Sequence, residues 1–473
     1  MDATLPARVQ FALTISYHYI YPPITIGLGL VLVVLVVLGA LHLRTGNPVW
    51  NQALRFWLRI YALNFALGIA TGIVQEFQFG TNWSTYSRFV GDVFGSALAA
   101  EGIFAFFLES GFLGVVLFAG DRIGPRMQVV ATTLVALGAH FSAIWIVVAN
   151  SWMQTPAGYH MVKGPGGETR AEVTSFWAVV FNPSALDRLL HVIVGAWMTG
   201  AFLVLSVSAW YLLRNRHHEF ARACIKVAHV IATFSTIFQV FISGDQSARY
   251  VAVYQPAKFA AMEGHWDSGP DPLAFVGWVD QNGGRTYSLG IPGGTSFLLD
   301  FDFGKTVKGL NEIRPDLRPP VNWVFQAYHV MISLGGFLLA LSLVCCLFLL
   351  WGRRLYRTRW LLWLLVPGPA YTIAANLAGW WTAEIGRQPF MVYKQLRTGQ
   401  GVSPTVPADA IIATIAMFVF IYSLLGALYV YLLNDKIQHG PEEADLERGP
   451  QPEPEITLAL RSTLASEKGL AEV

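Results

Sequence analysis

Cysteine and charge are the two things this sequence has least of. It contains three cysteines, Cys224, Cys345 and Cys346, which argues against a disulfide framework and against a zinc site. Charged residues make up 13% of the chain, whereas a soluble globular protein carries about 25%. The 32 basic residues nearly balance the 30 acidic ones, so the net charge of +2 does not favour nucleic acid as a partner.

Long apolar runs are what the sequence does have. Hydrophobic residues make up 54% of it, and the mean hydropathy is +0.46. A membrane-spanning helix needs about 20 mostly apolar residues, and nine stretches meet that criterion. They cover 12–42, 56–80, 94–119, 127–150, 187–213, 221–243, 323–351, 360–383 and 408–433. The composition predicts an all-α bundle of about nine transmembrane helices. The first run is too long for a signal peptide and lacks an A-x-A site, so we expect it to stay as a span.

Basic residues gather in alternate connections, after the odd-numbered spans. They are Arg44, Arg55, Arg59, Arg122, Arg126, Arg214, Arg216, Arg222, Lys226, Arg353, Arg354, Arg357, Arg359 and Lys436. Short cytoplasmic loops collect Lys and Arg, so the N-terminus is predicted outside and the C-terminus in the cytoplasm.

Four parts follow from the spacing of the runs. Residues 1–243 hold spans 1 to 6, and residues 323–437 hold spans 7 to 9. Between them, residues 244–322 form a Gly- and Pro-rich outside segment of the length that functional loops have. Residues 438–473 are charged and are expected to be a flexible cytoplasmic tail.

Ionisable side chains inside spans are costly, so each is a candidate functional residue. Those within or at the ends of the predicted spans include His18, Glu76, Glu101, Glu109, His191, Glu384 and Arg387. With the predicted topology, His18, Glu76, Glu101, His191, Met331 and Glu384 all fall in the outer half of the bilayer. A shared cofactor layer would explain that common depth. Histidine and methionine are axial haem ligands, which favours haem.

Each residue also has a simpler interpretation. A lone membrane histidine is more often a helix–helix hydrogen bonder, and Met331 alone would be packing. Glu76 and Glu101 could form a proton path in a transporter, and Glu384 with Arg387 could be a plain ion pair. His140 and His229 are interpreted as structural.

Four local sequence strings decide between the haem interpretation and the simpler ones. They are QEFQFGTNW at 75–83, EGIFAFFLES at 101–110, ANSWMQ at 149–154 and GWWTAEIGRQP at 379–389. They closely resemble the large subunit of cytochrome bd-type quinol oxidases, and the resemblance runs in order from about residue 8 to about residue 435.

The resemblance implies a role for each matching position. His18 and Glu384 match ligands of the two high-spin haems, and His191 and Met331 match the ligands of the low-spin b haem. Arg387 matches the arginine beside the glutamate ligand, and Glu101 and Glu109 match glutamates near the oxygen site and along the proton route. Positions that match haem- or channel-lining residues are Glu76, Ser142, Asn150 and His329.

The outside segment carries the match for quinol oxidation. Lys258 and Glu263 correspond to the quinol-loop pair of the family, within a loop of the shorter type.

The resemblance implies two b-type haems and one d-type haem, with a third b-type haem as the alternative to the d-type one. It also implies ubiquinol or menaquinol and oxygen as substrates, and the bacterial cytoplasmic membrane with its lipid as the location. A second membrane subunit, and possible small single-span subunits, are the implied partners.

Two positions depart from the pattern of the family. Phe390 ends the GRQP motif where Trp is more usual, and His329 stands where Arg is common. The shorter type of quinol loop leaves a variant of the cyanide-insensitive branch open.

Three other classes compete with this interpretation. A haem-copper oxidase or bc-type cytochrome b needs several histidines together, yet the one doublet, His217-His218, lies in a basic loop. A transporter would predict broken helices or inverted repeats, and the sequence shows neither clearly. A purely structural assembly subunit would have no use for buried ligand pairs.

Overall fold

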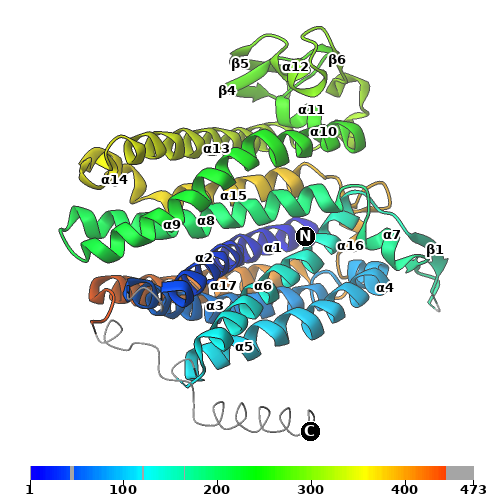
Figure 1. Ribbon diagram of the computed structural model, residues 1–473. Helices are drawn as coiled ribbons and strands as arrows, with labels where there is room; N and C mark the ends of the chain where they lie inside the picture. The colour runs from blue at the N-terminus through cyan, green and yellow to red at the C-terminus, as the bar shows by residue number, and fades with distance from the viewer. Residues whose placement is uncertain (1, 43–46, 120–121, 165, 444–473) are drawn as a thin grey trace, which may run out of the picture.

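The computed structural model describes residues 2–42, 47–119, 122–164 and 166–443 (Figure 1). Within those residues, nine helical stretches are long and apolar enough to cross a membrane. This confirms the predicted all-α transmembrane bundle. The predicted tail at 438–473 lies outside the described residues from 444 onward.

Five of the spans are single helices. They are α3 (Val49–Gly80), α6 (Pro125–Gln154), α8 (Ala185–Leu213), α13 (Val321–Leu350) and α17 (Ala408–His439).

The other four spans are interrupted. The first is α1 (Thr4–His18) with α2 (Tyr21–His42), and the eighth is α14 (Arg359–Leu365) with α15 (Gly368–Ile385). The third and sixth each contain a π-helical segment. They run as α4 (Ser84–Glu101), η1 (Gly102–Phe106) and α5 (Phe107–Ala119), and as α9 (His218–Phe238), η2 (Gln239–Gly244) and α10 (Asp245–Tyr254). Such segments occur often at functional sites.

Several helices are longer than the apolar runs that predicted them. The first span begins at Thr4 instead of residue 12, the third at Ser84 instead of 94, and the sixth continues to Tyr254 instead of 243. The added turns are polar, as in DQSARYVAVY at 245–254, so hydropathy does not detect them although the backbone remains helical. The predicted start of the outside segment at 244 therefore falls inside a helix.

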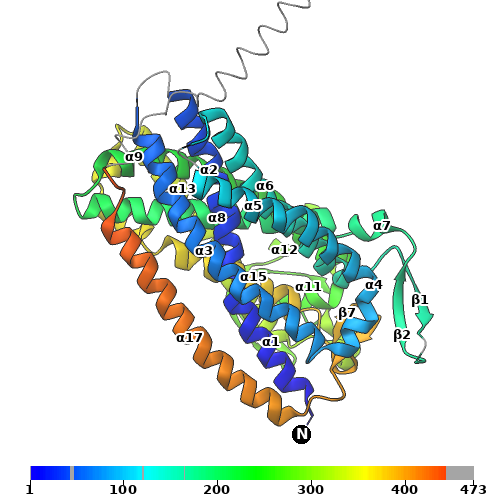
Figure 2. The ribbon, with the colours of Figure 1, turned by 90° about the horizontal axis from the view of Figure 1, so that it is seen from below.

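The core of the bundle is built around α8. Together with α2, α3 and α9 it forms the largest cluster of buried side chains, which includes Trp57 of α3 and Phe202 and Tyr211 of α8. Where α2 crosses α8, a Cβ on Gly27 would lie 2.2 Å from the carbonyl oxygen of Ala196, so the two backbones touch. In contrast, α17 runs along one side of the bundle and is largely exposed (Figure 2).

The long connections meet at one end of the bundle, which we call the loop-bearing end. The first contains β1 (Tyr159–Lys163), β2 (Thr169–Val173) and α7 (Phe176–Val180). The last contains β7 (Phe390–Val392), β8 (Leu396–Arg397) and α16 (Thr398–Gly401). A side-chain contact ties the last of these connections to the longest one, because Arg397 pairs with Asp316 at 2.9 Å. The basic connections 213–218 and 350–359 lie at the opposite end of the helices.

The longest connection forms a small module on the loop-bearing end (Figure 1). Its elements are α11 (Pro256–Glu263), β3 (Gly269–Pro270), β4 (Leu273–Asp280), β5 (Arg285–Ile291), α12 (Gly294–Asp300), β6 (Thr306–Val307), η3 (Leu310–Glu312) and η4 (Pro315–Leu317). The antiparallel pairs are β4 with β5 and β3 with β6. A separate apolar cluster, with Ala260, Trp266 and Leu310, seats the module against Phe325 of α13.

Candidate functional site

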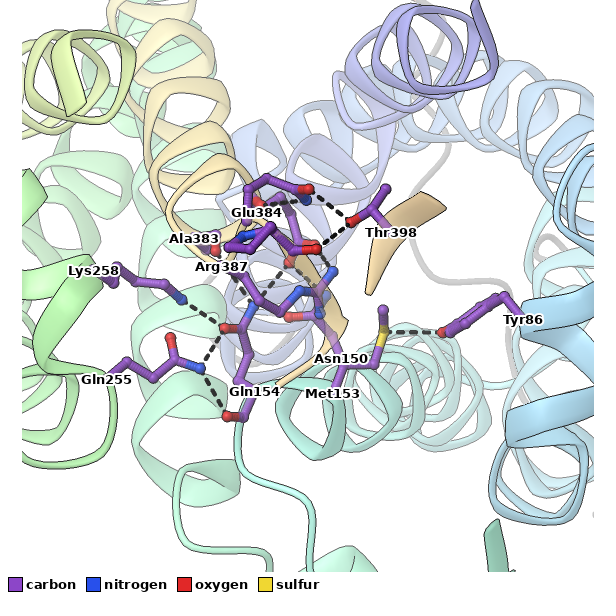
Figure 3. A network of polar contacts seen from close by, with 12 residues as sticks. Tyr86, Asn150, Met153, Gln154, Gln255, Lys258, Ala383, Glu384, Arg387 and Thr398 are labelled. Atoms are coloured by element: carbon purple, nitrogen blue, oxygen red, sulfur yellow. Dashed lines mark hydrogen bonds and ion pairs between the residues drawn. The ribbon is translucent and has the colours of Figure 1, made fainter. Parts of the chain in front are cut away.

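A buried polar cluster lies where α6, α8, α11 and α15 meet at the loop-bearing end (Figure 3). At its centre is the carboxylate of Glu384. Its Oε1 accepts hydrogen bonds from Asn150 at 3.0 Å and Gln154 at 3.2 Å, and its Oε2 pairs with Arg387. On the far side, Arg188 donates to Oδ1 of Asn150 at 2.5 Å. This set of donors holds Glu384 as an anion.

Gln154 joins this cluster to the outside module. Nζ of Lys258 donates to Oε1 of Gln154 at 2.6 Å, and Nε2 of Gln255 donates to the backbone carbonyl of Gln154 at 2.7 Å (Figure 3). Since the amide nitrogen of Gln154 faces Glu384, its oxygen is left to face Lys258. One amide therefore links Lys258 on α11 to Glu384 on α15.

Lys258 is 2% exposed and lies close to the GRQP turn. A Cβ on Gly386 would come 2.7 Å from Cγ of Lys258, so only glycine permits this approach. Burial lowers the pKa of Lys258 well below its ordinary value, and the cations Arg188 and Arg387 lower it further, while Glu384 opposes them. Burial and the two cations therefore favour the neutral amine of Lys258 over its charged form.

Glu263 lies on the same helix but contacts different groups. The hydroxyl of Thr295 lies 3.3 Å from its Oε2, and the hydroxyl of Tyr328 also hydrogen-bonds to it. Burial raises the pKa of Glu263, and the nearby charge of Asp271 raises it further. Lys258 and Glu263, predicted as a pair, thus point into separate polar environments.

His18 is oriented by Thr71 of α3. The two side chains are 2.9 Å apart, between Nδ1 and Oγ1. The single hydroxyl proton of Thr71 is donated to the carbonyl of Leu67 at 2.9 Å, so Oγ1 accepts from Nδ1–H of His18. This leaves Nε2 with its lone pair, which is the tautomer a metal ligand requires. Gly72 lies against the ring, with only 3.2 Å between a Cβ built there and Cε1.

His191 and Met331 lie beside small or amide-bearing neighbours. The amide nitrogen of Gln239, in the π-helical segment η2, is 3.2 Å from each ring nitrogen of His191. Sδ of Met331 would be 2.7 Å from a Cβ on Gly379 of α15. Both residues are thus held by elements of the loop-bearing half of the bundle.

Two glutamates follow one another along the third span. Oγ of Ser142 donates to Glu101 at 2.8 Å, and the hydroxyl of Tyr61 donates to Glu109 at 2.6 Å. Glu109 is buried, whereas Glu101 is half-buried directly before η1. Glu76 is exposed on the surface of α3.

The remaining predicted positions are more ordinary. His329 stacks on Phe325, and its Nδ1 bonds the carbonyl of that residue at 2.8 Å, as a structural histidine would. His140 likewise bonds the carbonyl of Ala136 and accepts from Trp197 at 2.9 Å. Phe390 packs against Tyr393 in the turn that follows GRQP.

Sequence reasoning missed Arg188, Gln154, His265 and Asp271. Arg188 could have been found, because it is a charge in the first turn of a span, three residues before His191. Gln154 stands in one of the family strings without a role of its own. No sequence pattern singles out His265 and Asp271, because their contact depends on how the module folds.

The residues present fit a cofactor that brings its own macrocycle. Among the described residues, no three His, Cys, Asp or Glu side chains come together in a group that could hold a metal ion. A porphyrin needs one or two protein ligands per iron, which isolated His18, His191, Met331 and Glu384 can supply. In the same described part, Nε and Nη1 of Arg387 and Nε of Arg188 are buried without a hydrogen-bond partner. Such unpartnered guanidinium groups suit the carboxylates of a haem.

Fold and site together define a multi-pass membrane protein with a buried, charged, redox-compatible centre near one end of its helices. The family profile described as cytochrome bd terminal oxidase subunit I matches residues 6–441. The chain belongs to this family.

Named relatives agree over nearly the whole chain. Cytochrome bd ubiquinol oxidase subunit 1 of Bacillus subtilis is 36% identical, over 93% of this chain and 95% of the relative. Cytochrome bd-II ubiquinol oxidase subunit 1 of Escherichia coli is 32% identical, over 94% and 98%. The solved bd oxidase of Geobacillus thermodenitrificans superimposes with a TM-score of 0.85 at 29% identity, covering 93% of this chain and 99% of that one. Membership of this family argues against the transporter alternative, although four of the spans are interrupted.

Proposed function

We propose that this chain oxidises quinol at the loop-bearing end and carries the haems at which oxygen is reduced to water with protons from the cytoplasm. Membership of the cytochrome bd family supports a quinol oxidase with haem cofactors. The observation that carries the proposal for this chain is the Lys258–Gln154–Glu384 link, which connects the outside module to the bundle. With the loop-bearing end outside, charge separates across the membrane without a pump.

Four side chains would hold the irons. His191 and Met331 would ligate a low-spin b-type haem, and His18 and Glu384 would each ligate a high-spin haem, one of b-type and one of d-type or again b-type. Arg387 would pair with haem carboxylates, and Glu76, Asn150 and His329 would line the haems. When bound, the haems supply electron transfer and oxygen reduction.

The outside module would hold quinol between α11 and the bundle. Quinol oxidation releases two electrons and two protons, so the site needs a proton acceptor beside a group that recognises a ring oxygen. Glu263, whose pKa is raised by burial, is suited to accept a proton from the quinol hydroxyl. Lys258 would position the second ring oxygen, since its amine has a fixed acceptor in Gln154.

The protons consumed at the oxygen site would arrive through Glu109 and then Glu101. These residues are eight positions apart on one span, or about 12 Å along a helix axis. Hydroxyl groups accompany both, Tyr61 at Glu109 and Ser142 at Glu101. A chain of carboxyl and hydroxyl groups is what a proton path through a membrane requires.

The second subunit and the membrane would cover the apolar outside of the bundle. Exposed side chains on the third span include Ile103, Phe104, Phe107 and Phe118. In water such a surface would be unfavourable, whereas a second membrane subunit or lipid covers it. We place the complex in the bacterial cytoplasmic membrane, with small single-span subunits as further possible partners.

One spectrum tests the proposal. The dithionite-reduced complex should show haem bands, and His191→Ala should remove the low-spin b-type band while leaving the high-spin bands. His140→Ala is the matched control, because that histidine is bonded to Ala136 and Trp197 and should leave the spectrum intact. A reduced His191→Ala spectrum identical to that of the parent would refute the ligand assignment.

A further inference from the structure

A buried carboxylate–imidazole pair lies next to Glu263 and has no part in the quinol and haem chemistry proposed above. Nδ1 of His265 is 2.8 Å from Oδ1 of Asp271, and the side chains are 8% and 1% exposed. Burying a charged pair is costly, and well-packed hydrophobic residues in its place are often at least as stabilising. The position of this pair therefore calls for a reason.

The local fold brings the pair to Glu263. α11 ends at Glu263, and Gly264 turns the chain with a φ of +63°, so that His265 folds back under the helix. Thr295 bridges the other side. Its hydroxyl reaches Glu263, and its backbone nitrogen donates to the carbonyl of Asp271 at 3.1 Å.

The two oxygens of Asp271 are incompletely satisfied. In the described part of the chain, neither oxygen accepts an aligned hydrogen bond although the residue is fully buried, and Oδ1 has only the ion-pair contact of 2.8 Å with Nδ1 of His265. A buried carboxylate oxygen without a partner is unfavourable, unless it takes up a proton or a water molecule. The charge of Asp271 is close enough to Glu263 to raise the pKa of Glu263.

The far side of the imidazole faces strand β6. Nε2 of His265 lies 3.2 Å from the carbonyl oxygen of Val307 in β6. Val307 also lines a cavity of about 340 Å³, together with Arg249, Phe259, Asp300, Lys305 and Lys308. Lys305 and Asp300 on its rim are about half exposed, so water reaches the cavity.

We propose that Asp271 and His265 carry the proton that Glu263 takes from quinol to the water of this cavity. The proposal rests on the proposed role of Glu263 in quinol oxidation. Neither residue touches the substrate, so both act through Glu263. The proton leaves the quinol oxygen for Glu263 and passes to Oδ2 of Asp271, whose Oδ1 gives up a proton to Nδ1 of His265. Nε2 of His265 then releases its own proton to cavity water when its contact with the carbonyl of Val307 opens. No electrons move along this route, because they go from quinol to the haems.

The electrostatics of the pair fit a relay. Burial alone would lower the pKa of His265, but its bond to Asp271 and the negative charge of Asp271 reverse this and raise it. Burial also raises the pKa of Asp271, against the effect of His265. Charged groups on the surrounding elements are engaged elsewhere, since Glu312 accepts from Ser268 and Arg249 pairs with Asp245 at 2.8 Å. Tyr328 is the remaining titratable neighbour, and it bonds Glu263.

The test compares two electron donors in the intact oxidase complex. Quinol must release protons when it is oxidised, whereas one-electron oxidation of tetramethyl-p-phenylenediamine releases none. For Asp271→Asn and for His265→Asn we expect kcat with quinol to fall by about tenfold or more, with KM little changed. The solvent deuterium isotope effect on kcat should rise, because proton exit becomes rate-limiting. Oxygen uptake driven by the diamine should stay at the parental rate.

Two further variants make the test more specific. Asp271→Glu keeps the carboxylate and should recover most of the quinol activity. Asp267→Asn is the matched control, because Asp267 is exposed and bonds only Asn311, at 2.8 Å, among the described residues. Its kcat and isotope effect should equal those of the parent.

A purely structural pair would give another result. In that case quinol KM would rise, or activity with both donors would fall together, and the isotope effect would not change; either outcome overturns the relay. Glu263→Gln separates this failure from failure of the proposed function. If Glu263→Gln oxidises quinol normally, the quinol site itself is misplaced. If Glu263→Gln is inactive with quinol while both pair variants match the parent, only the relay is wrong.

Discussion

At the scale of single residues, Gln154 is the residue that links the outside module to the buried polar cluster. Its amide accepts from Lys258 with one end and donates to Glu384 with the other. Asn150 does not have the same role, because it donates a hydrogen bond to Glu384 but does not contact Lys258. The orientation of the amide is therefore fixed by the amine of Lys258 on one side and the carboxylate of Glu384 on the other.

Gln154→Leu removes this link at nearly constant volume. Lys258 would then be buried without its amide acceptor, a loss of about 1–3 kcal/mol for a polar group. We expect quinol KM to rise and kcat to fall, while the reduced haem spectrum keeps its low-spin band. Quinol-dependent oxygen uptake measures the effect. Gln395→Leu, at an exposed position outside the cluster, is the control. Unchanged quinol kinetics in Gln154→Leu would contradict the assigned role.

The single residues also show where sequence reasoning reached the site and where it did not. Glu384, Arg387 and Asn150 were predicted as site residues, and the structure brings them together. Their common location followed from charge inside spans and from the family strings. His265 and Asp271 could not be predicted, because a Gly turn and a two-residue strand create their contact.

At the scale of elements, the helices were predictable and their ends were not. Apolar length located all nine spans, yet α10 is polar and extends the sixth span by about three turns beyond the predicted end. The strands of the outside module were not predicted, since β4 and β5 are half exposed and lie outside the apolar runs. Hydropathy detects burial in a membrane, whereas β4 buries only single side chains such as Ala274 and Val279.

The outside module should lose stability as the pH rises. The pKa values of Glu263, Asp271 and His265 are all raised in the folded protein. Each group therefore holds a proton in the folded module that the unfolded chain has already released, so the free energy of unfolding falls with pH. The fall begins near the ordinary carboxyl values, 3.8 for Asp271 and 4.5 for Glu263, and continues through the raised values.

Limited proteolysis measures this change in the intact complex. Cleavage within 256–307 should be faster at pH 8 than at pH 6, after correction for the activity of the protease. Asp271→Asn should flatten the dependence, since it removes one of the titrating groups and weakens the shift of the others. A module that becomes more resistant to cleavage as the pH rises would contradict the upward direction of these three pKa shifts.

At the scale of the whole molecule, the two ends differ in kind. One end carries the long connections and the polar cluster, and the other carries the short basic connections with Arg214, Arg216 and Arg353. The charge rule predicts that the basic end faces the cytoplasm. Proton release at one end and proton uptake from the other would then make the reaction electrogenic.

Labelling of single cysteines tests this orientation. In intact cells, Ser268→Cys in the exposed part of the outside module should react with a membrane-impermeant maleimide. Arg216→Cys, exposed at the opposite end, should react only after the membrane is opened. The native Cys224 and Cys345 are buried and provide little background, and the half-buried Cys346 is replaced by serine in both variants. The reverse pattern of labelling would invert the proposed sidedness.

The shape of α11 has a consequence for inhibitors. Lys258 and Glu263 are five residues apart, so they project about 140° apart around the helix axis. One short helix thus presents two separately mutable surfaces, one toward Gln154 and the GRQP turn and one toward Thr295 and Tyr328. A compound that mimics quinol at the lysine surface alone would leave the glutamate surface free. Substitutions that confer resistance to this compound should then arise around Gln154 and Gly386, without loss of proton release through Glu263.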